Sequence, residues 1–249
     1  TEFCLFLQKD FMHLFYDKNI FSDFHVLNEE ETRHCVKVLR LNIGDAVYLT
    51  DGMGNFYETH IVENHAKKAI LKIVKKTENY GKRNFNLHIA IAPTKMNERF
   101  EWFVEKSVEI GIDEITPVIC GNSERKIIKT ERINRVAEAA MKQSYKAYHP
   151  QINEQINLEK FLKQNLNYKQ KFIAHCSEND NKIYLGSVLE KQSSYLILIG
   201  PEGDFTENEI QMCKDAGFVE VSLGESRLRT ETAGVVTCSI VSVVNSILL

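Results

Sequence analysis

The apolar residues in the first third of the chain are spaced in a way that predicts short β-strands. Apolar runs at 46–50, 56–62 and 69–74 follow one another closely, and Asp51-Gly-Met-Gly54 between the first two is typical of a hairpin turn. A shorter apolar run occupies Phe3–Leu7. Strands this close together predict a small β-barrel or a curled sheet.

One helix is predicted within this β-rich part. Asn28 stands where an N-cap residue would, Glu31 follows at the capping-box position, and an apolar run to Leu39 comes next.

Beyond about residue 85 the pattern changes to strands that alternate with helices. Strands are predicted at 86–92, 115–120, 171–176, 195–199 and 218–223, and helices at 97–110, 131–145, 207–216 and from about 232 to 249. This alternation predicts an α/β fold with a parallel sheet. We therefore predict a β domain in residues 1–75, a polar linker in 76–84 and an α/β domain in 85–249.

Composition adds a few exclusions. The chain is 43% hydrophobic and 26% charged, an ordinary globular balance, and no apolar run is long enough for a membrane span. We find no basic-then-apolar leader and expect a cytoplasmic protein that does not engage a membrane. The six cysteines form no CxxC pair, so we expect free thiols. The histidines form no close pair, so we expect no metal site.

The net charge of −3 does not indicate a nucleic-acid partner, but residues 121–146 carry seven basic and only three acidic side chains. A local basic patch can attract phosphates on a near-neutral protein. The alternative is a solvated helix face with Glu/Arg pairs at helical spacing, and charge alone favours this alternative.

The stretch YLILIGPEGDFTENEI, residues 195–210, joins a buried strand to a helix through a glycine loop. Thr206 and Glu209 have the spacing of a capping box, and Phe205 and Ile210 that of a hydrophobic staple. The loop Gly200–Asp204 is therefore held at both ends. Loops of this kind, at the carboxyl end of a parallel strand, are where α/β proteins bind ligands.

The ligand that this loop would suit is not a phosphate. The loop lacks the glycine patterns of phosphate cradles, and Glu202 and Asp204 would repel one. S-adenosylmethionine offers a sulfonium, an amine and ribose hydroxyls, which suit acidic surroundings. The alternative is a tight strand–helix turn that binds nothing.

A second strand–glycine–helix segment covers residues 221–233, VSLGESRLRTETA. We expect the two loops to follow adjacent strands and to lie side by side at one sheet edge. Arg229 and Glu231 stand at the mouth of the final helix, where a surface salt bridge and a helix N-terminal acid are the ordinary alternative.

IGPEGDFTENEI and LGESRLRTETA together resemble the signature pair of the bacterial ribosomal RNA small-subunit (uracil-N3)-methyltransferase family, in the SPOUT superfamily. Further resemblances at residues 34–45, 95–125 and 138–150 extend over nearly the whole chain. The resemblance implies a small N-terminal PUA-like β-barrel and a C-terminal SPOUT-type parallel sheet with a deep trefoil knot. The chain departs from the usual family pattern at Asp204, where glycine is usual, at Ser226-Arg227 and at Lys146.

The resemblance also implies a cofactor, S-adenosyl-L-methionine, held by the knot loops. The implied cofactor-binding residues are Ile199, Gly200, Pro201, Glu202, Gly203, Leu223, Gly224, Ser226, Leu228, Arg229, Thr232 and Ala233. We expect Gly203→Val to abolish binding, because a β-branched residue lacks the backbone freedom of glycine.

The implied substrate is N3 of a uridine in small-subunit (16S) ribosomal RNA. We expect Arg229 to contact a carbonyl or phosphate and either Glu231 or Glu202 to accept the N3 proton, and the residues leave that choice open. Candidates for holding RNA are Arg40, Arg99, Arg125, Arg132, Lys142 and Tyr145.

Two rival functions stay open at this point. A non-catalytic RNA-binding protein with a PUA-like module would bind no S-adenosylmethionine. An enzyme that uses a dinucleotide is disfavoured by the missing glycine fingerprint.

The final helix is apolar on more than one face, which predicts more than one packing partner. Those partners could lie within the same chain, but the resemblance favours a homodimer. We expect Val241→Glu and Val244→Glu to separate its subunits.

Overall fold

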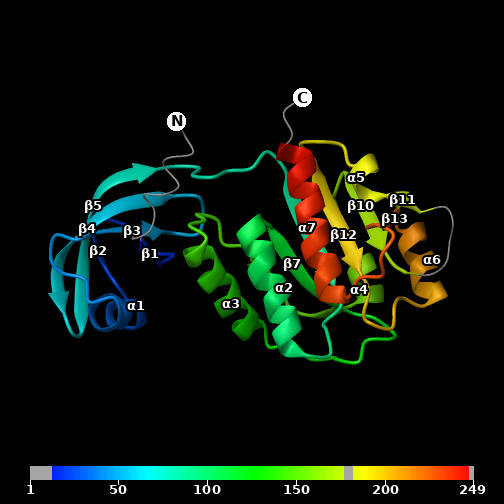
Figure 1. Ribbon diagram of the computed structural model, residues 1–249, viewed down its shortest axis with the longest axis horizontal. Helices are drawn as coiled ribbons and strands as arrows, with labels where there is room; N and C mark the ends of the chain where they lie inside the picture. Colours follow the sequence, from blue (N-terminus) through cyan, green and yellow to red (C-terminus); the bar gives the residue numbers. More distant parts are fainter. Residues whose placement is uncertain (1–12, 177–181, 247–249) are drawn as a thin grey trace. The chain divides into compact units, whose positions relative to one another are not determined.

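The computed structural model describes residues 13–176 and 182–246 of the 249-residue chain. The predicted segment Phe3–Leu7 and the last three residues lie outside this part. The chain forms two compact units (Figure 1). Among the described residues, one unit contains residues 13–82 together with Met141–His149, and the other contains Arg83–Ala140 together with residues 150–176 and 182–246.

The first unit is built on a five-stranded sheet in the order β1-β3-β4-β5-β2. Strands β3, β4 and β5 pair antiparallel in sequence, which confirms the predicted meander. The bounds are Leu14–Tyr16 for β1, Phe24–Val26 for β2, Ala46–Thr50 for β3, Phe56–His65 for β4 and Lys68–Thr77 for β5.

A helix packs against this sheet at its predicted place. Helix α1, Glu29–Arg33, begins after Asn28, whose side-chain oxygen accepts a hydrogen bond from the Glu31 backbone N–H at 2.9 Å. It continues into a π-helical turn, η2, over His34–Val38. Cys35 of this turn is fully buried in the hydrophobic core of the unit.

The segment Met141–His149 belongs to the first unit although it is distant in sequence. Gly54 N–H donates to the Ala147 carbonyl at 2.8 Å, and His149 N–H donates to the Gly52 carbonyl at 2.9 Å. Ala147 is buried in a small cluster with Leu14 and Phe56. The predicted domain boundaries at residues 75 and 84 stay a prediction, while this segment shows that the first unit draws on two stretches of chain.

The second unit contains a parallel sheet in the order β11-β13-β10-β12-β6-β7-β8, with β9 paired to β7. All of these pairings are parallel, so the predicted α/β class is confirmed. The bounds are Asn86–Ile91 for β6, Glu114–Ile119 for β7, Gln151–Ile152 for β8, Ile156–Asn157 for β9, Gln170–Ala174 for β10, Ile183–Tyr184 for β11, Ser194–Ile199 for β12 and Val219–Ser222 for β13.

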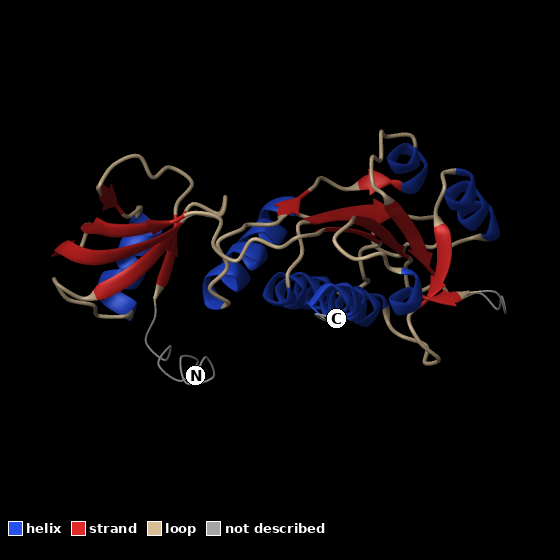
Figure 2. Ribbon diagram, turned by 90° about the horizontal axis from the view of Figure 1, so that it is seen from above, coloured by secondary structure: helices blue, strands red, loops and turns tan. Residues whose placement is uncertain are grey.

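Helices cover both faces of this sheet (Figure 2). Helices α2 and α7 pack together on one face, and α4 and α6 lie on the other. Gly234 allows α7 to approach α2 closely, because a Cβ at this position would collide with the ring of Phe103. The bounds are Asn97–Ile110 for α2, Thr130–Gln143 for α3, Leu158–Leu162 for α4, Leu185–Val188 for α5, Glu207–Asp215 for α6 and Thr230–Ser246 for α7.

The order of strands corrects one expectation. Strands β12 and β13, which precede the two glycine loops, are not adjacent, because β10 lies between them and pairs with both. Hydrophobic patterns give the strands but not their order, since the order depends on how the connections cross the sheet.

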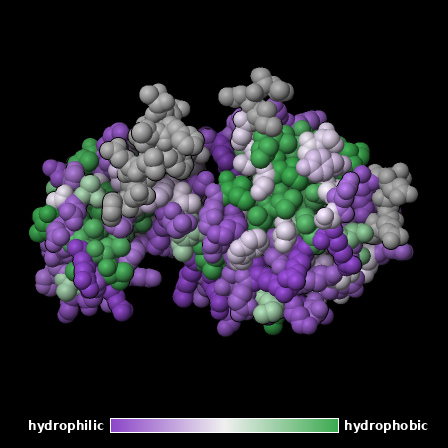
Figure 3. Space-filling view, viewed as in Figure 1, coloured by the Kyte–Doolittle hydropathy of each residue, from purple (hydrophilic) through white to green (hydrophobic). Residues whose placement is uncertain are grey.

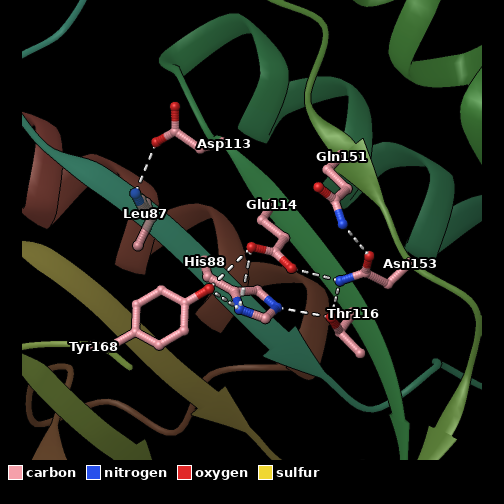
Figure 4. A network of polar contacts seen from close by, with 8 residues as sticks. All are labelled: Leu87, His88, Asp113, Glu114, Thr116, Gln151, Asn153 and Tyr168. Atoms are coloured by element: carbon pink, nitrogen blue, oxygen red, sulfur yellow. Dashed lines mark hydrogen bonds and ion pairs between the residues drawn. The ribbon is translucent and has the colours of Figure 1, made fainter. Parts of the chain in front are cut away.

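A partly buried polar network lies where β6 and β7 meet (Figure 4). The Tyr168 hydroxyl donates to Glu114 Oε2 at 2.9 Å, so its oxygen is left to accept from His88 Nδ1 at 2.9 Å. His88 Nε2 lies 2.7 Å from the Thr116 hydroxyl, which in turn accepts from Asn153 Nδ2 at 2.7 Å. This arrangement satisfies a neutral imidazole, with the proton on Nδ1 and Nε2 as acceptor.

The network predicts that the folded state becomes less stable as the pH falls. Burial lowers the pKa of His88 from 6.5 to about 4, against a smaller opposing effect of Glu114. Between these values the unfolded chain binds a proton that the folded chain does not. The free energy of unfolding should therefore decrease as the pH falls from 6.5 towards 4, by up to about 1.4 kcal/mol per pH unit.

Urea unfolding between pH 7 and pH 5 measures this dependence. His88→Gln should lower the slope of the free energy of unfolding against pH, by an amount that corresponds to the uptake of at most one proton on unfolding. His60→Gln, which removes an exposed histidine, should leave the slope unchanged. Equal slopes for wild type and His88→Gln would show that His88 does not carry the effect.

Candidate functional site

A pocket of about 600 Å³ opens at the carboxyl edge of the parallel sheet. Its lining comes from the ends of β10, β12 and β13 and from the start of α7. The volume falls within the usual range of small-molecule sites. Ten of the predicted cofactor-binding residues line it: Ile199, Gly200, Pro201, Glu202, Leu223, Gly224, Ser226, Leu228, Arg229 and Ala233.

Two predicted cofactor-binding residues, Gly203 and Thr232, do not line this pocket. The structure also adds lining residues at the end of β10 that the sequence analysis missed. These residues are Ala174, His175 and Cys176, and we call them the wall after β10. A signal was present, because a strand was predicted to end near Cys176, and parallel strands end at one sheet edge. The added lining residues are Ala174, His175, Cys176, Lys182, Asp204, Val221, Ser222, Glu225, Arg227 and Thr230.

The loop Gly200–Asp204 is fixed on the side of the following helix. The predicted capping box is present, with Glu209 N–H donating to Thr206 Oγ1 at 3.2 Å and Thr206 N–H donating to Glu209 Oε2 at 2.8 Å. The other oxygen of Glu209 accepts from Gly121 N–H at 2.7 Å. Phe205 and Ile210 are buried in the same hydrophobic cluster, as the staple pattern predicts.

Two further side chains hold this loop. Asn122 Nδ2 donates to the carbonyls of Gly203 and Asp204 at 3.0 and 3.1 Å. The Thr230 hydroxyl, at the start of α7, donates to the Gly200 carbonyl at 3.0 Å. The loop after β12 is therefore tied to the loop after β7 and to the last helix.

The glycines of the site serve different purposes. Gly224 has a φ of +136°, a left-handed value that strains any residue with a side chain. A Cβ on Gly200 would lie 2.9 Å from the ring of Phe205. Gly203 does not have a left-handed φ, and a Cβ there would lie 3.1 Å from Asn122 Cβ. The backbone argument made for Gly203 therefore applies to Gly224, and at Gly203 the constraint is the contact with Asn122.

Glu202 places a carboxylate at the pocket. Its Oε1 accepts from Lys95 N–H at 2.9 Å, while its Oε2 is buried and has no hydrogen-bond partner among the described residues. The Lys95 carbonyl accepts from Arg125 Nη2 at 2.6 Å, which supports the segment that holds Glu202. One carboxylate oxygen is thus oriented by a backbone N–H, and the other is buried without a hydrogen-bond partner among the described residues.

Glu231 lies near the pocket in sequence but does not line it. Its side chain is 7% exposed, and Oε1 is 3.8 Å from Nε of Arg99. Its Oε2 is buried without a hydrogen-bond partner in the part of the chain that the structure describes. The predicted residue Arg229 is exposed and lines the pocket.

Most of the predicted RNA-binding side chains have partners within the chain. In the second unit Arg99 faces Glu231, Arg125 donates to the carbonyls of Thr94 and Lys95, and Arg132 Nε lies 2.6 Å from Glu101 Oε1. In the first unit Lys142 Nζ lies 2.6 Å from Glu31 Oε1, and Tyr145 packs at the edge of the cluster around Ala147. Arg40, also in the first unit, has a left-handed φ of +55°.

The remaining chemistry-bearing groups are structural in character. Burial raises the pKa of the Cys35 thiol to about 11 and the pKa values of the Cys213 and Cys238 thiols to about 12. Cys176 is free and exposed. Within residues 13–176 and 182–246, no cluster of three or more His, Cys, Asp or Glu side chains could hold a metal ion. No helix in the same ranges is long and apolar enough to cross a membrane.

Residues 81–242 match the family of RNA methyltransferase domains, and residues 27–74 match the PUA domain of RNA methyltransferases. The chain belongs to this RNA methyltransferase family. The PUA match falls within the first unit, and the methyltransferase match spans the pocket.

Individual relatives agree with this assignment. A probable rRNA-methyltransferase from Porphyromonas gingivalis is 40% identical, with a TM-score of 0.87 over 94% of this chain and 98% of that one. Ribosomal RNA small subunit methyltransferase E from Neisseria gonorrhoeae, solved bound to S-adenosyl methionine, is 26% identical, with a TM-score of 0.84 over 94% of this chain and 98% of that one. The protein of the same name from Mesomycoplasma hyopneumoniae is 29% identical over 90% of this chain and 96% of its own.

The capping box predicts a measurable contribution to stability. Thr206→Ala removes the side-chain acceptor at the start of α6 and should cost ~1 kcal/mol in the free energy of unfolding, measured by urea titration. Asn208→Ala serves as the control, because Asn208 is the second residue of α6 and is exposed. This substitution should change the free energy of unfolding far less. Equal losses in the two variants would refute the special role of the cap.

Proposed function

We propose that this chain is an S-adenosylmethionine-dependent methyltransferase that acts on N3 of a uridine in small-subunit (16S) ribosomal RNA. The observation that carries the proposal is the pocket at the carboxyl edge of the sheet, formed by two glycine loops in a chain of the RNA methyltransferase family. The names of the relatives support the class of RNA, and one of them was solved with this cofactor.

The residues present fit S-adenosylmethionine. Ile199, Leu223 and Leu228 supply apolar surface for an adenine ring, while the backbone of the two loops supplies amides and carbonyls. The buried Oε2 of Glu202 lacks a partner within the described residues, and a hydrogen-bond donor of the bound cofactor or substrate would satisfy it. When bound, this cofactor supplies an electrophilic methyl group.

The chain's own groups have to orient the uridine and manage the N3 proton. Arg229, exposed at the pocket, is suited to stabilise negative charge on the carbonyl oxygens that flank N3. Glu202 lines the pocket and Glu231 does not, so we propose Glu202 as the proton acceptor. Glu231, buried beside Arg99, would then support the start of α7.

RNA binding is proposed for both units. N3 lies on the pairing edge of uracil, so the base must be unpaired or flipped out to reach the pocket. Arg40, Lys142 and Tyr145 would contact RNA from the first unit, and Arg99, Arg125 and Arg132 from the second. Because Arg99, Arg125, Arg132, Lys142 and Tyr145 already have contacts within the chain, RNA would have to bind beside these contacts or replace them.

Three finer features complete the proposal. We propose that the five-stranded sheet of the first unit closes as a PUA-like barrel and that the loops of the second unit form a deep trefoil knot, as the resemblance implies. We also propose that the protein works in the cytoplasm, where ribosomal RNA is modified.

The deciding experiment is a methylation assay with tritiated S-adenosylmethionine. Isolated small-subunit RNA and assembled subunits are compared as substrates, and the labelled nucleoside is identified by chromatography. Tritiated N3-methyluridine supports the proposal. A label on another atom contradicts the assigned position. If neither substrate is labelled and the protein binds no cofactor, the chain is a non-catalytic RNA-binding protein.

Cofactor binding is tested at Gly224. The left-handed φ of this residue means that Gly224→Val distorts the pocket, so one-to-one binding of S-adenosylmethionine in calorimetry should be lost. Gly81→Val is the matched control, because Gly81 also has a left-handed φ, with open space around it, but does not line the pocket. If both variants bind like wild type, the glycine loops do not form the site.

We also propose that the protein is a homodimer that pairs through α7. Hydrophobic side chains gather over α7 in Figure 3, and Val243 is 56% exposed there. Val241, where the sequence analysis placed a charge to separate the subunits, is fully buried in the chain's own core. Val241→Glu would therefore damage the fold itself, and it cannot serve as a test of the dimer.

Val243→Glu is the appropriate test. A charge on this exposed side chain should leave the fold intact and shift the protein from twice the chain mass to the chain mass in sedimentation at micromolar concentration. Val219→Glu, at an exposed valine on β13, should sediment like wild type. A wild-type monomer with full methylation activity would contradict the proposal.

A further inference from the structure

Asp204 links two separate parts of the pocket. It ends the loop Gly200–Asp204, and its half-buried side chain accepts two backbone N–H groups. Oδ1 accepts from Phe205 N–H at 2.9 Å, and Oδ2 accepts from Cys176 N–H at 2.8 Å. Because Cys176 follows β10, one carboxylate joins the loop after β12 to the wall after β10.

The backbone of Asp204 is held in place independently of these two bonds. Its φ is +61°, a left-handed value that aspartate and asparagine tolerate better than most residues. Its N–H donates to the Pro201 carbonyl at 2.9 Å, and its carbonyl accepts from Asn122 Nδ2 at 3.1 Å. The carboxylate is therefore presented to Cys176 from a fixed backbone.

The wall after β10, which makes this connection through Cys176, is also held by contacts that do not involve Asp204. His175 Nε2 lies 3.0 Å from Glu220 Oε1, and Glu220 Oε2 lies 2.7 Å from Nζ of Lys214 in α6. Nζ of Lys182 donates to the His175 carbonyl at 2.7 Å. These contacts hold the wall to β13 and α6, and the Asp204 carboxylate connects it to the loop after β12.

We propose that Asp204 is a positioning residue for cofactor binding. By tying Cys176 to the loop after β12, it fixes the separation between two sides of the pocket and hence the fit of the bound cofactor. This inference rests on the proposed function, and it gives Asp204 a role that a glycine at this position would lack.

The first arm of the test compares affinities for S-adenosylhomocysteine by calorimetry. Asp204→Gly keeps the left-handed backbone but loses both hydrogen bonds, so the pocket is less preorganised and should bind the ligand about tenfold more weakly. Asp204→Asn tolerates the same backbone and keeps one acceptor oxygen, so it should fall between wild type and glycine.

Gln192→Gly is the matched control. Gln192 also has a left-handed φ, of +56°. It precedes β12 in the same unit, its side chain is exposed, and it does not line the pocket. This variant gains the same backbone freedom as Asp204→Gly, and it should bind S-adenosylhomocysteine with wild-type affinity.

The second arm does not depend on the cofactor. Amide hydrogen exchange in the free protein should be slow at Cys176 in wild type and at least about tenfold faster in Asp204→Gly, because the amide loses its acceptor. In a methylation assay, Asp204→Gly should raise KM for S-adenosylmethionine while leaving KM for RNA unchanged, a split that a general loss of folding would not produce.

The outcomes separate the two proposals. Faster exchange together with weaker cofactor binding supports the positioning role. Faster exchange with wild-type affinity overturns it, and so does unchanged exchange at Cys176. If wild type itself fails to bind S-adenosylhomocysteine, the proposed function fails, while the exchange measurement still decides whether Asp204 holds the wall.

Discussion

Strand β12 is hydrogen-bonded to a parallel neighbour on each side, to β6 over its whole length and to β10 from Tyr195 to Ile199. Five of its six side chains are buried. A strand enclosed in this way has no freedom to shift its register, because a shift would break its pairing with both neighbours and displace side chains that are closely packed on both faces of the sheet. The position of Gly200 is therefore fixed by the sheet, and the other contacts of the pocket are built outward from that point.

Outward from β12, the pocket is organised by hydrogen bonds to backbone groups. Thr230, Asn122 and Glu209 each bind backbone groups of neighbouring segments. Bonds of this type hold loops whose own N–H and C=O groups have no strand partner. These hydrogen bonds explain why a site made of loops can still be preorganised.

Local patterns in the sequence were sufficient for local structure. The capping box of Thr206 and Glu209 and the staple of Phe205 and Ile210 depend on residues a few positions apart, and each was predicted correctly. The wall after β10 was missed because strand order is a property of the whole sheet. The exposure of α7 was misjudged at Val241 for a similar reason, since the packing of α7 against α2 decides which face is covered.

The return of Met141–His149 to the first unit bears on how the chain folds during synthesis. The burial of Ala147 with Phe56, and the backbone hydrogen bonds to Gly52 and Gly54, require residues that follow Arg83–Ala140, a little over a third of the second unit. Domains commonly fold from the N-terminus as they emerge from the ribosome. Here the first unit stays incomplete until His149 has left the exit tunnel, so the folding of the two units is coupled in time by the path of the chain.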